Sequence, residues 1–239
     1  MATRELPRLV EEALQDMAAC DADKTMTTLV RERLPLLKKQ ARSRNEAIIN
    51  RSELVIVITG DESGRLPLAA AYAKALQGFE ITAGRDDAES AVVKTVRWRD
   101  VISDEKGNPL PFRKASDQFY AAKSEAEGGV LVIENIYDLP LNTASKTSVE
   151  QAQNGAFQML ADLLMDYSYA EKDYTPAIVL TGDADKIRRF LDEHRGVAVY
   201  FTSPFITAAA PPPPPPLIST ETTSDVIVGR PLKLRGLQK

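Results

Sequence analysis

The chain has 239 residues, 44% of them hydrophobic, and a formal net charge of -4. This length can bury one medium-sized core, and the small acidic excess differs from the marked basic excess of proteins that bind nucleic acid or acidic lipid. Cys20 and His194 are the single cysteine and histidine, which excludes a disulfide or a Cys/His zinc site within one chain. Without an apolar run near the roughly 20 residues that span a bilayer, we expect a soluble, unexported protein in a reducing cytoplasm.

The first part of the chain predicts helices. Between residues 5 and 45 apolar residues recur at helical spacing, with an interruption at residues 21–24. We therefore expect a helical pair or an antiparallel hairpin within an N-terminal helical segment, residues 1–50. Bases outnumber acids over residues 38–51, and this pattern favours a solvated helix face over a nucleic-acid contact.

Short apolar runs then alternate with stretches of helical character. The runs cover residues 54–58, 92–98, 130–133, 177–180 and 197–201. Parallel strands need crossover helices, and near-continuous apolar runs indicate strands that are buried on both faces. The alternation predicts an α/β domain over residues 51–207 with a mainly parallel five-stranded sheet.

Six consecutive prolines, residues 211–216, end this pattern, because proline has no N–H to donate and favours an extended rod. We expect an Ala/Pro-rich linker over residues 208–216 and a flexible basic tail over residues 217–239. The tail carries an apolar stretch at residues 226–228 and four bases after it. It is either a docking peptide for a protein partner or a disordered extension, and the sequence leaves both open.

The stretch TGDESGRLPLAAAYAKAL, residues 59–76, joins the first predicted strand to a helix. It is similar to a phosphate-binding loop, G-x-x-x-x-G-K-S/T, whose lysine neutralises phosphate and whose hydroxyl ligates Mg²⁺. Arg65 stands at the lysine position and Leu66 at the hydroxyl position, while Asp61 and Glu62 add negative charge. Arginine keeps the positive charge but has a larger, planar head, so the exchange is not conservative at a tight phosphate site.

Four segments in order resemble AAA+ ATPases of the CbxX/CfxQ type, which include Rubisco activases and the ATPases of type VII secretion. They read IVITGDESGRLPLAAAYAKAL, TVRWRDVIS, GGVLVIENIYDL and IVLTGDADKIRRFLDEHRGVAVYF. The resemblance implies a P-loop NTPase-like (AAA+) three-layer core preceded by N-terminal helices. The family adds a small C-terminal helical lid, which the proline tract replaces here.

The chain departs from the family's pattern at its catalytic positions. Where the family has Asp-Glu after an apolar run, this sequence has Glu134 and Asn135, and asparagine cannot take a proton from water. Thr181 stands near the family's sensor position and keeps a hydroxyl. The two arginine-finger positions hold Ala198 and Tyr200. An arginine finger raises the rate of hydrolysis by a factor of about a thousand or more where it acts.

Two aromatic residues are predicted to be structural. Trp98 ends an apolar run and is expected in the core. Phe112 falls near the aromatic residue with which the family threads its clients, but a lone aromatic side chain more often packs against the core. We therefore expect a surface loop with Phe112 tucked against the core.

Together these losses predict a catalytically inactive AAA+-like scaffold, adaptor or assembly subunit that acts by protein–protein binding, beside an active AAA+ ATPase or in a larger machine. No cofactor, metal or membrane partner is expected. The alternative is a nucleotide-binding switch or slow ATPase that holds ATP or ADP with Mg²⁺. Its candidate contacts are Gly60, Ser63, Gly64, Arg65, Glu134 and Thr181. A second alternative is a nucleic-acid-binding module, which would use the basic run and the tail.

Overall fold

The computed structural model describes residues 6–43, 54–82, 91–138, 154–155, 158–164 and 175–212. The predicted tail of residues 217–239, and most of the proline tract before it, lie outside the described residues. The helices are α1 (Arg8–Ala18), α2 (Thr25–Thr28), the π-helix η1 (Leu29–Arg33), α3 (Leu34–Ser43), α4 (Glu62–Gly78), α5 (Trp98–Ile102), α6 (Phe112–Glu125), α8 (Ala184–Glu193) and α9 (Arg195–Ala198). The strands are β1 (Ile56–Gly60), β2 (Val93–Arg97), β3 (Val130–Glu134), β4 (Ala177–Thr181) and β5 (Ile206–Ala208).

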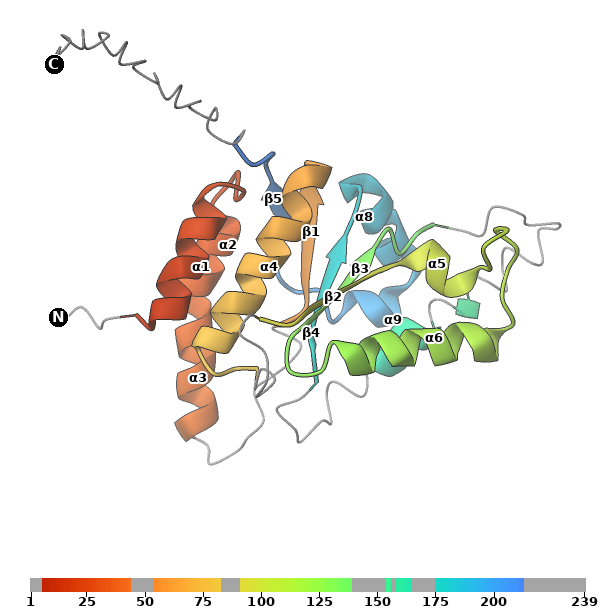
Figure 1. Cartoon of the computed structure of the whole chain (residues 1–239), viewed down its shortest axis with the longest axis horizontal. Helices are drawn as coiled ribbons and strands as arrows, with labels where there is room; N and C mark the ends of the chain where they lie inside the picture. Colours follow the sequence, from red (N-terminus) through yellow and green to blue (C-terminus); the bar gives the residue numbers. More distant parts are fainter. Residues whose placement is uncertain are drawn as a thin grey trace, which may run out of the picture.

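The five strands form one all-parallel sheet in the order β2-β3-β4-β1-β5 (Figure 1). The apolar residues of β1, β3 and β4 are buried, as expected for strands covered on both faces. This confirms the predicted α/β class and the parallel sheet, and the arrangement is compatible with a P-loop-like three-layer core. Because the strands are parallel, the ends of β1, β2, β3 and β4 meet at one edge of the sheet, which we call the carboxyl edge.

Helix α4 lies between the sheet and α1, side by side with α1 in Figure 1. Its alanine-rich sequence suits this place, because small side chains let it pack closely on both sides. A Cβ built at Gly78 would lie 2.8 Å from Val10 Cγ2, and Lys74 Nζ lies 2.6 Å from Asp16 Oδ2. The predicted N-terminal helices are confirmed, with their break at residues 21–24, and they share one hydrophobic core with the sheet.

The predicted strand over residues 197–201 is wrong. Val197 and Ala198 donate their N–H groups to the carbonyl oxygen of His194, so this segment closes its backbone hydrogen bonds locally in α9 and the turn after it. Val199 is 66% exposed. The fifth strand is β5, where Ile206 is buried and pairs with Ile58. Strand β5 ends at Ala208, one residue beyond the domain end expected from the sequence.

The α1–α2 connection covers the outer side of β5. Ala22 N donates to Thr207 O at 3.0 Å, and Ala209 N donates to Cys20 O at 2.8 Å. Asp21 holds this connection in place, because its buried carboxylate accepts hydrogen bonds of 2.7 Å from both the N–H and the hydroxyl of Thr27. The chain after β5 is thereby fixed beside the start of α4.

Trp98 and Phe112, the two aromatic residues predicted to be structural, differ in burial. Trp98 is buried and meets Phe119 edge to face, as predicted for a core residue. The expectation for Phe112 is wrong, because it is the first residue of α6 and is 52% exposed. Ala115 and Phe119 form the buried stripe of α6, and Phe112 continues that stripe one turn beyond the end of the core.

No helix within the described ranges is long and apolar enough to cross a membrane.

Candidate functional site

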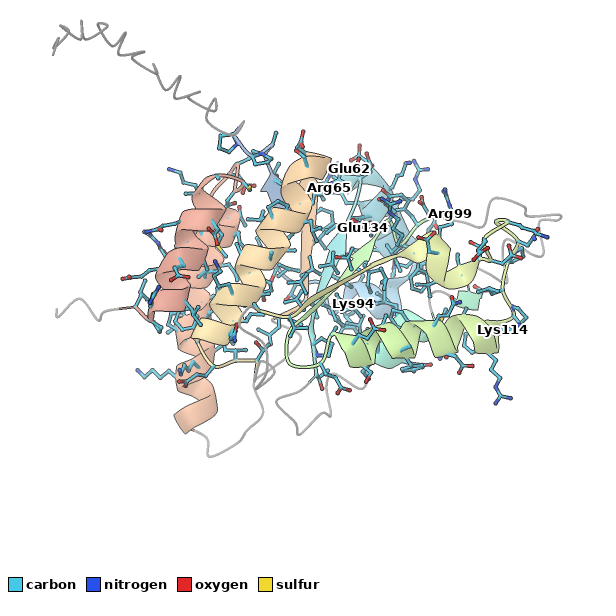
Figure 2. The ribbon with its side chains drawn as sticks, viewed as in Figure 1. Glu62, Arg65, Lys94, Arg99, Lys114 and Glu134 are labelled. Atoms are coloured by element: carbon cyan, nitrogen blue, oxygen red, sulfur yellow. The ribbon has the colours of Figure 1, made fainter. Side chains whose placement is uncertain are left out.

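A polar cavity of about 280 Å³ lies at the carboxyl edge of the sheet. Its lining residues come from the ends of β2, β3 and β4 and from the start of α4: Glu62, Arg65, Arg97, Arg99, Asp100, Glu134, Asn135, Asp138 and Thr181. Figure 2 shows Glu62, Arg65, Glu134 and Arg99 at the same end of the sheet. Of the predicted nucleotide contacts, the fold brings Arg65, Glu134 and Thr181 together around this cavity, whereas Gly60, Ser63 and Gly64 do not line it.

The connection between β1 and α4 is a single residue. Strand β1 ends at Gly60 and helix α4 begins at Glu62, so only Asp61 lies between them. The Asp61 carboxylate caps the helix by accepting hydrogen bonds from the hydroxyl and the N–H of Ser63, and these bonds hold the pKa of Asp61 below its usual range. A phosphate-binding loop offers such N–H groups to its ligand, but here Ser63 N–H is already bonded to the protein.

The backbone after β5 lies directly against this turn. Asp61 N donates to Ala208 O at 2.9 Å. A Cβ built at Gly60, where φ is +86°, would lie 2.3 Å from the same oxygen, and one built at Gly64 would lie 1.9 Å from Ala209 O. Both glycines are therefore required by the close approach of the chain's own backbone. The sequence predicts them as phosphate contacts and gives no sign of this packing.

Arg65 folds back onto the turn that precedes it. Its Nε and Nη2 donate to the carbonyl oxygen of Gly60 at 3.1 and 2.7 Å. A lysine, with its compact ammonium, cannot make this two-pronged contact. The side chain at the phosphate-binding position thus stabilises the β1–α4 turn.

Ion pairs occupy much of the cavity wall. Arg97 Nε lies 3.3 Å from Glu134 Oε2, and Arg99 Nη2 lies 3.3 Å from Asp138 Oδ2. Altogether three arginines face four carboxylates around the cavity. A polyphosphate placed there would meet these carboxylates at close range, and like charges in a partly desolvated site repel by of order 1 kcal/mol or more per pair.

Asn135 follows β3. In the AAA+ ATPases that the sequence resembles, this position holds the catalytic glutamate. Its φ is +53°, a left-handed conformation that asparagine tolerates better than most residues. Its N–H donates to Thr181 O at 2.8 Å, and its Oδ1 accepts from the Tyr137 hydroxyl at 2.8 Å. The Tyr137 oxygen in turn accepts from Asp183 N at 2.9 Å.

These hydrogen bonds join the ends of β3 and β4, and we call the set of Asn135, Tyr137 and Asp183 the strand-end bridge. Gly182 passes close beneath it, since a Cβ there would lie 2.9 Å from the Tyr137 oxygen. Asp183 also caps α8 by accepting from Asp185 N and Lys186 N. The sequence analysis identifies Asn135 as a lost base but misses the bridge. Its only signal is a polar side chain within two residues of the end of each of two neighbouring buried strands.

Thr181 contributes a hydroxyl group to the wall of the cavity. It is 3% exposed and lines the cavity, and within the described residues its hydroxyl makes no hydrogen bond. No described residue has a buried side-chain polar atom that lacks a partner, so the Thr181 hydroxyl is open to solvent in the cavity. A hydroxyl that is open to the cavity favours a bound small molecule.

The two positions that correspond to the arginine fingers of AAA+ ATPases lie away from the cavity. Ala198 ends α9 and Tyr200 follows it, and neither lines the cavity. From β5 to residue 212 the chain contains no helix that could act as a lid. The described residues contain no group of three or more His, Cys, Asp or Glu side chains placed to hold a metal ion.

No protein-family model matches this chain, and no curated protein matches it.

The close packing of residue 209 on the turn predicts a large effect of one methyl group. We expect Gly64→Ala to lower the free energy of unfolding by about 2 kcal/mol or more, because the new Cβ overlaps Ala209 O. The control is Gly196→Ala, in the exposed part of α9, where the change should stay below about 1 kcal/mol. Chemical denaturation measures both variants, and a fully stable Gly64→Ala protein would contradict this packing.

The strand-end bridge predicts a second effect. Tyr137→Phe leaves Asn135 Oδ1 without its donor and Asp183 N–H without its acceptor, so we expect a loss of about 1–2 kcal/mol in unfolding free energy. Exchange of the Asp183 amide hydrogen should also become faster. Tyr200→Phe is the control, since the Tyr200 hydroxyl makes no hydrogen bond within the described part of the chain. Equal stability of the two variants would argue against the bridge.

Proposed function

We propose that this chain is a catalytically inactive AAA+-like scaffold, adaptor or assembly subunit that acts by binding other proteins in the cytoplasm. The observation that carries the proposal is the state of the β1–α4 turn. The turn is the single residue Asp61. The N–H groups of Asp61 and Ser63 are bonded to Ala208 O and to the Asp61 carboxylate, and the Arg65 side chain is bonded to Gly60 O. A phosphate group would have to displace several of these contacts at once.

The positions that would carry hydrolysis support the same proposal. Asn135 cannot serve as a general base, and its amide oxygen is bonded to Tyr137. Glu134 is paired with Arg97, so its charge is already compensated. Loss of the base, of the Mg²⁺ hydroxyl and of both finger arginines removes separate steps of phosphoryl transfer, and each of these losses is costly on its own.

The second candidate is a nucleotide-binding switch without turnover. It is favoured by Thr181, whose hydroxyl is open to solvent in the cavity that it shares with Arg65. In such a switch, nucleotide would pull Arg65 from Gly60 O and open the turn. Because breaking these contacts costs free energy, only a fraction of the molecules would be in the open state. The apparent affinity would then be the affinity of the open state multiplied by that fraction.

Calorimetric titration with ATP and with ADP, each with and without Mg²⁺, separates the two candidates. For the scaffold we expect no heat of binding at millimolar nucleotide, in the wild type and in Arg65→Ala alike. Micromolar binding that Arg65→Ala abolishes would overturn the scaffold proposal and support the switch. Arg188→Ala, at an exposed side chain of α8, controls for a general loss of positive charge.

A further inference from the structure

The two edges of the sheet differ in what covers them. The outer side of β5 is covered by the α1–α2 connection, whereas no strand of the described chain pairs with the outer side of β2. Val92 O accepts from Val130 N and therefore faces β3. Because backbone groups alternate in direction along a strand, those of Val93, Thr95 and Arg97 point outward. Strand β2 thus offers three residues to which another strand can add.

Helix α6 forms one wall of a groove beside this edge. A cavity of about 350 Å³ is lined by β2 and by one side of α6, which contributes Gln118, Ala121, Ala122 and Glu125. Figure 2 shows Lys94 of β2 just above α6. Because Lys94, near the start of β2, pairs with Glu125 at the end of α6, the helix and the strand run in opposite directions. The two alanines, about one helical turn from Glu125, therefore lie level with the middle of β2.

The two ends of the groove carry the same kinds of charge. Lys94 and Glu125 line the end at the start of β2, and Arg97 and Asp100 line the other end. Each end therefore has one base and one acid, and small side chains lie between the ends. Equivalent halves are what a two-fold interface between identical chains requires, because each half must fit the opposite half of a second copy.

We propose that β2 is a dimerisation edge, which pairs antiparallel with β2 of a second copy of this chain. In the register centred on Thr95, the three outward-facing residues of one copy meet those of the other and form about six backbone hydrogen bonds. The two sheets then join into one continuous sheet, and the α6 helices of both copies lie on the same face of it.

The side chains of β2 favour this register. It places Thr95 opposite Thr95 of the second copy, and threonine pairs across antiparallel strands are favourable. Lys94 lies opposite Val96 and Arg97 opposite Val93, so the long side-chain stems cover β-branched residues. A register centred on Lys94 would instead set two lysines directly against each other, which is unfavourable.

The charges at the ends of the groove complement one another across the pair. Antiparallel pairing brings the Lys94 end of one copy beside the Arg97 end of the other. Glu125 then faces Arg97 of the second copy, and Lys94 faces Asp100 of the second copy. Within the described part of the chain the Asp100 carboxylate makes no ion pair or hydrogen bond, so it is available for this contact.

This inference goes beyond the proposed function, because the β2 edge can pair whether or not the carboxyl-edge cavity binds nucleotide. In an antiparallel dimer the carboxyl edges of the two copies point in opposite directions. A scaffold built in this way presents two equivalent surfaces to its partners.

Sedimentation equilibrium of the full chain between about 1 µM and about 1 mM tests the proposal. The test variant is Ala121→Arg and the matched control is Ala70→Arg, because both alanines are exposed within helices. Of the two, only Ala121 lies near the two-fold axis, where two arginines would meet. We expect the wild type to dimerise in this range, Ala121→Arg to raise the dissociation constant at least about tenfold, and Ala70→Arg to leave it unchanged.

Amide hydrogen exchange locates the contact. The Thr95 amide points outward and should exchange more slowly as the wild-type concentration rises, whereas the amides of Lys94 and Val96 face β3 and should not change. A wild type that stays monomeric at the highest concentration would overturn the proposal. Equal dissociation constants for the two variants would also overturn it, because the dimer would then use another surface. Slow Thr95 exchange at every concentration, in the wild type and in Ala121→Arg alike, would show that a segment of the same chain covers the edge, and the proposal would fail.

Discussion

The packing of residues 208 and 209 on the β1–α4 turn is the constraint on which the rest of the site depends. Ala208 accepts the hydrogen bond of Asp61 N, and its neighbour Ala209 approaches so closely that position 64 must be glycine. The α1–α2 connection holds this segment from the other side, because Ala22 N donates to Thr207 O and Ala209 N donates to Cys20 O. The N-terminal helices, β5 and the start of α4 are therefore one unit, and the turn cannot open without disturbing all three.

Around this turn, residue types that suit phosphate chemistry make contacts within the protein. Arg65 binds a backbone carbonyl, Glu134 pairs with Arg97, and Asn135 ties the end of β3 to the end of β4. Such contacts give the carboxyl edge a fixed shape. A fixed edge suits a protein that presents a surface to partners, because little conformational entropy is lost when partners bind.

The sequence predicts the first four strands because their apolar runs are buried on both faces, which local pattern alone can indicate. The fifth was misplaced, since residues 197–201 are as apolar as β5 but satisfy their backbone within a short helix. Arg65, Glu134 and Thr181 were predicted as nucleotide contacts from the resemblance to AAA+ ATPases, and they line one cavity because parallel strands end at one edge. The roles of Gly60 and Gly64 were not predictable, because they depend on a backbone approach from residues more than 140 positions away.

The central claim is that the protein itself fills the place where a phosphate would bind. The most direct test is a titration of the isotope-labelled protein with Mg²⁺ and ATP, followed through the backbone amide signals of Asp61, Ser63 and Gly64. We predict that these signals stay in place at 10 mM nucleotide, roughly the level that would detect millimolar binding. We also expect the Asp61 amide to exchange slowly with solvent. Saturable shifts centred on these three amides would show that the turn opens for phosphate and would contradict the claim.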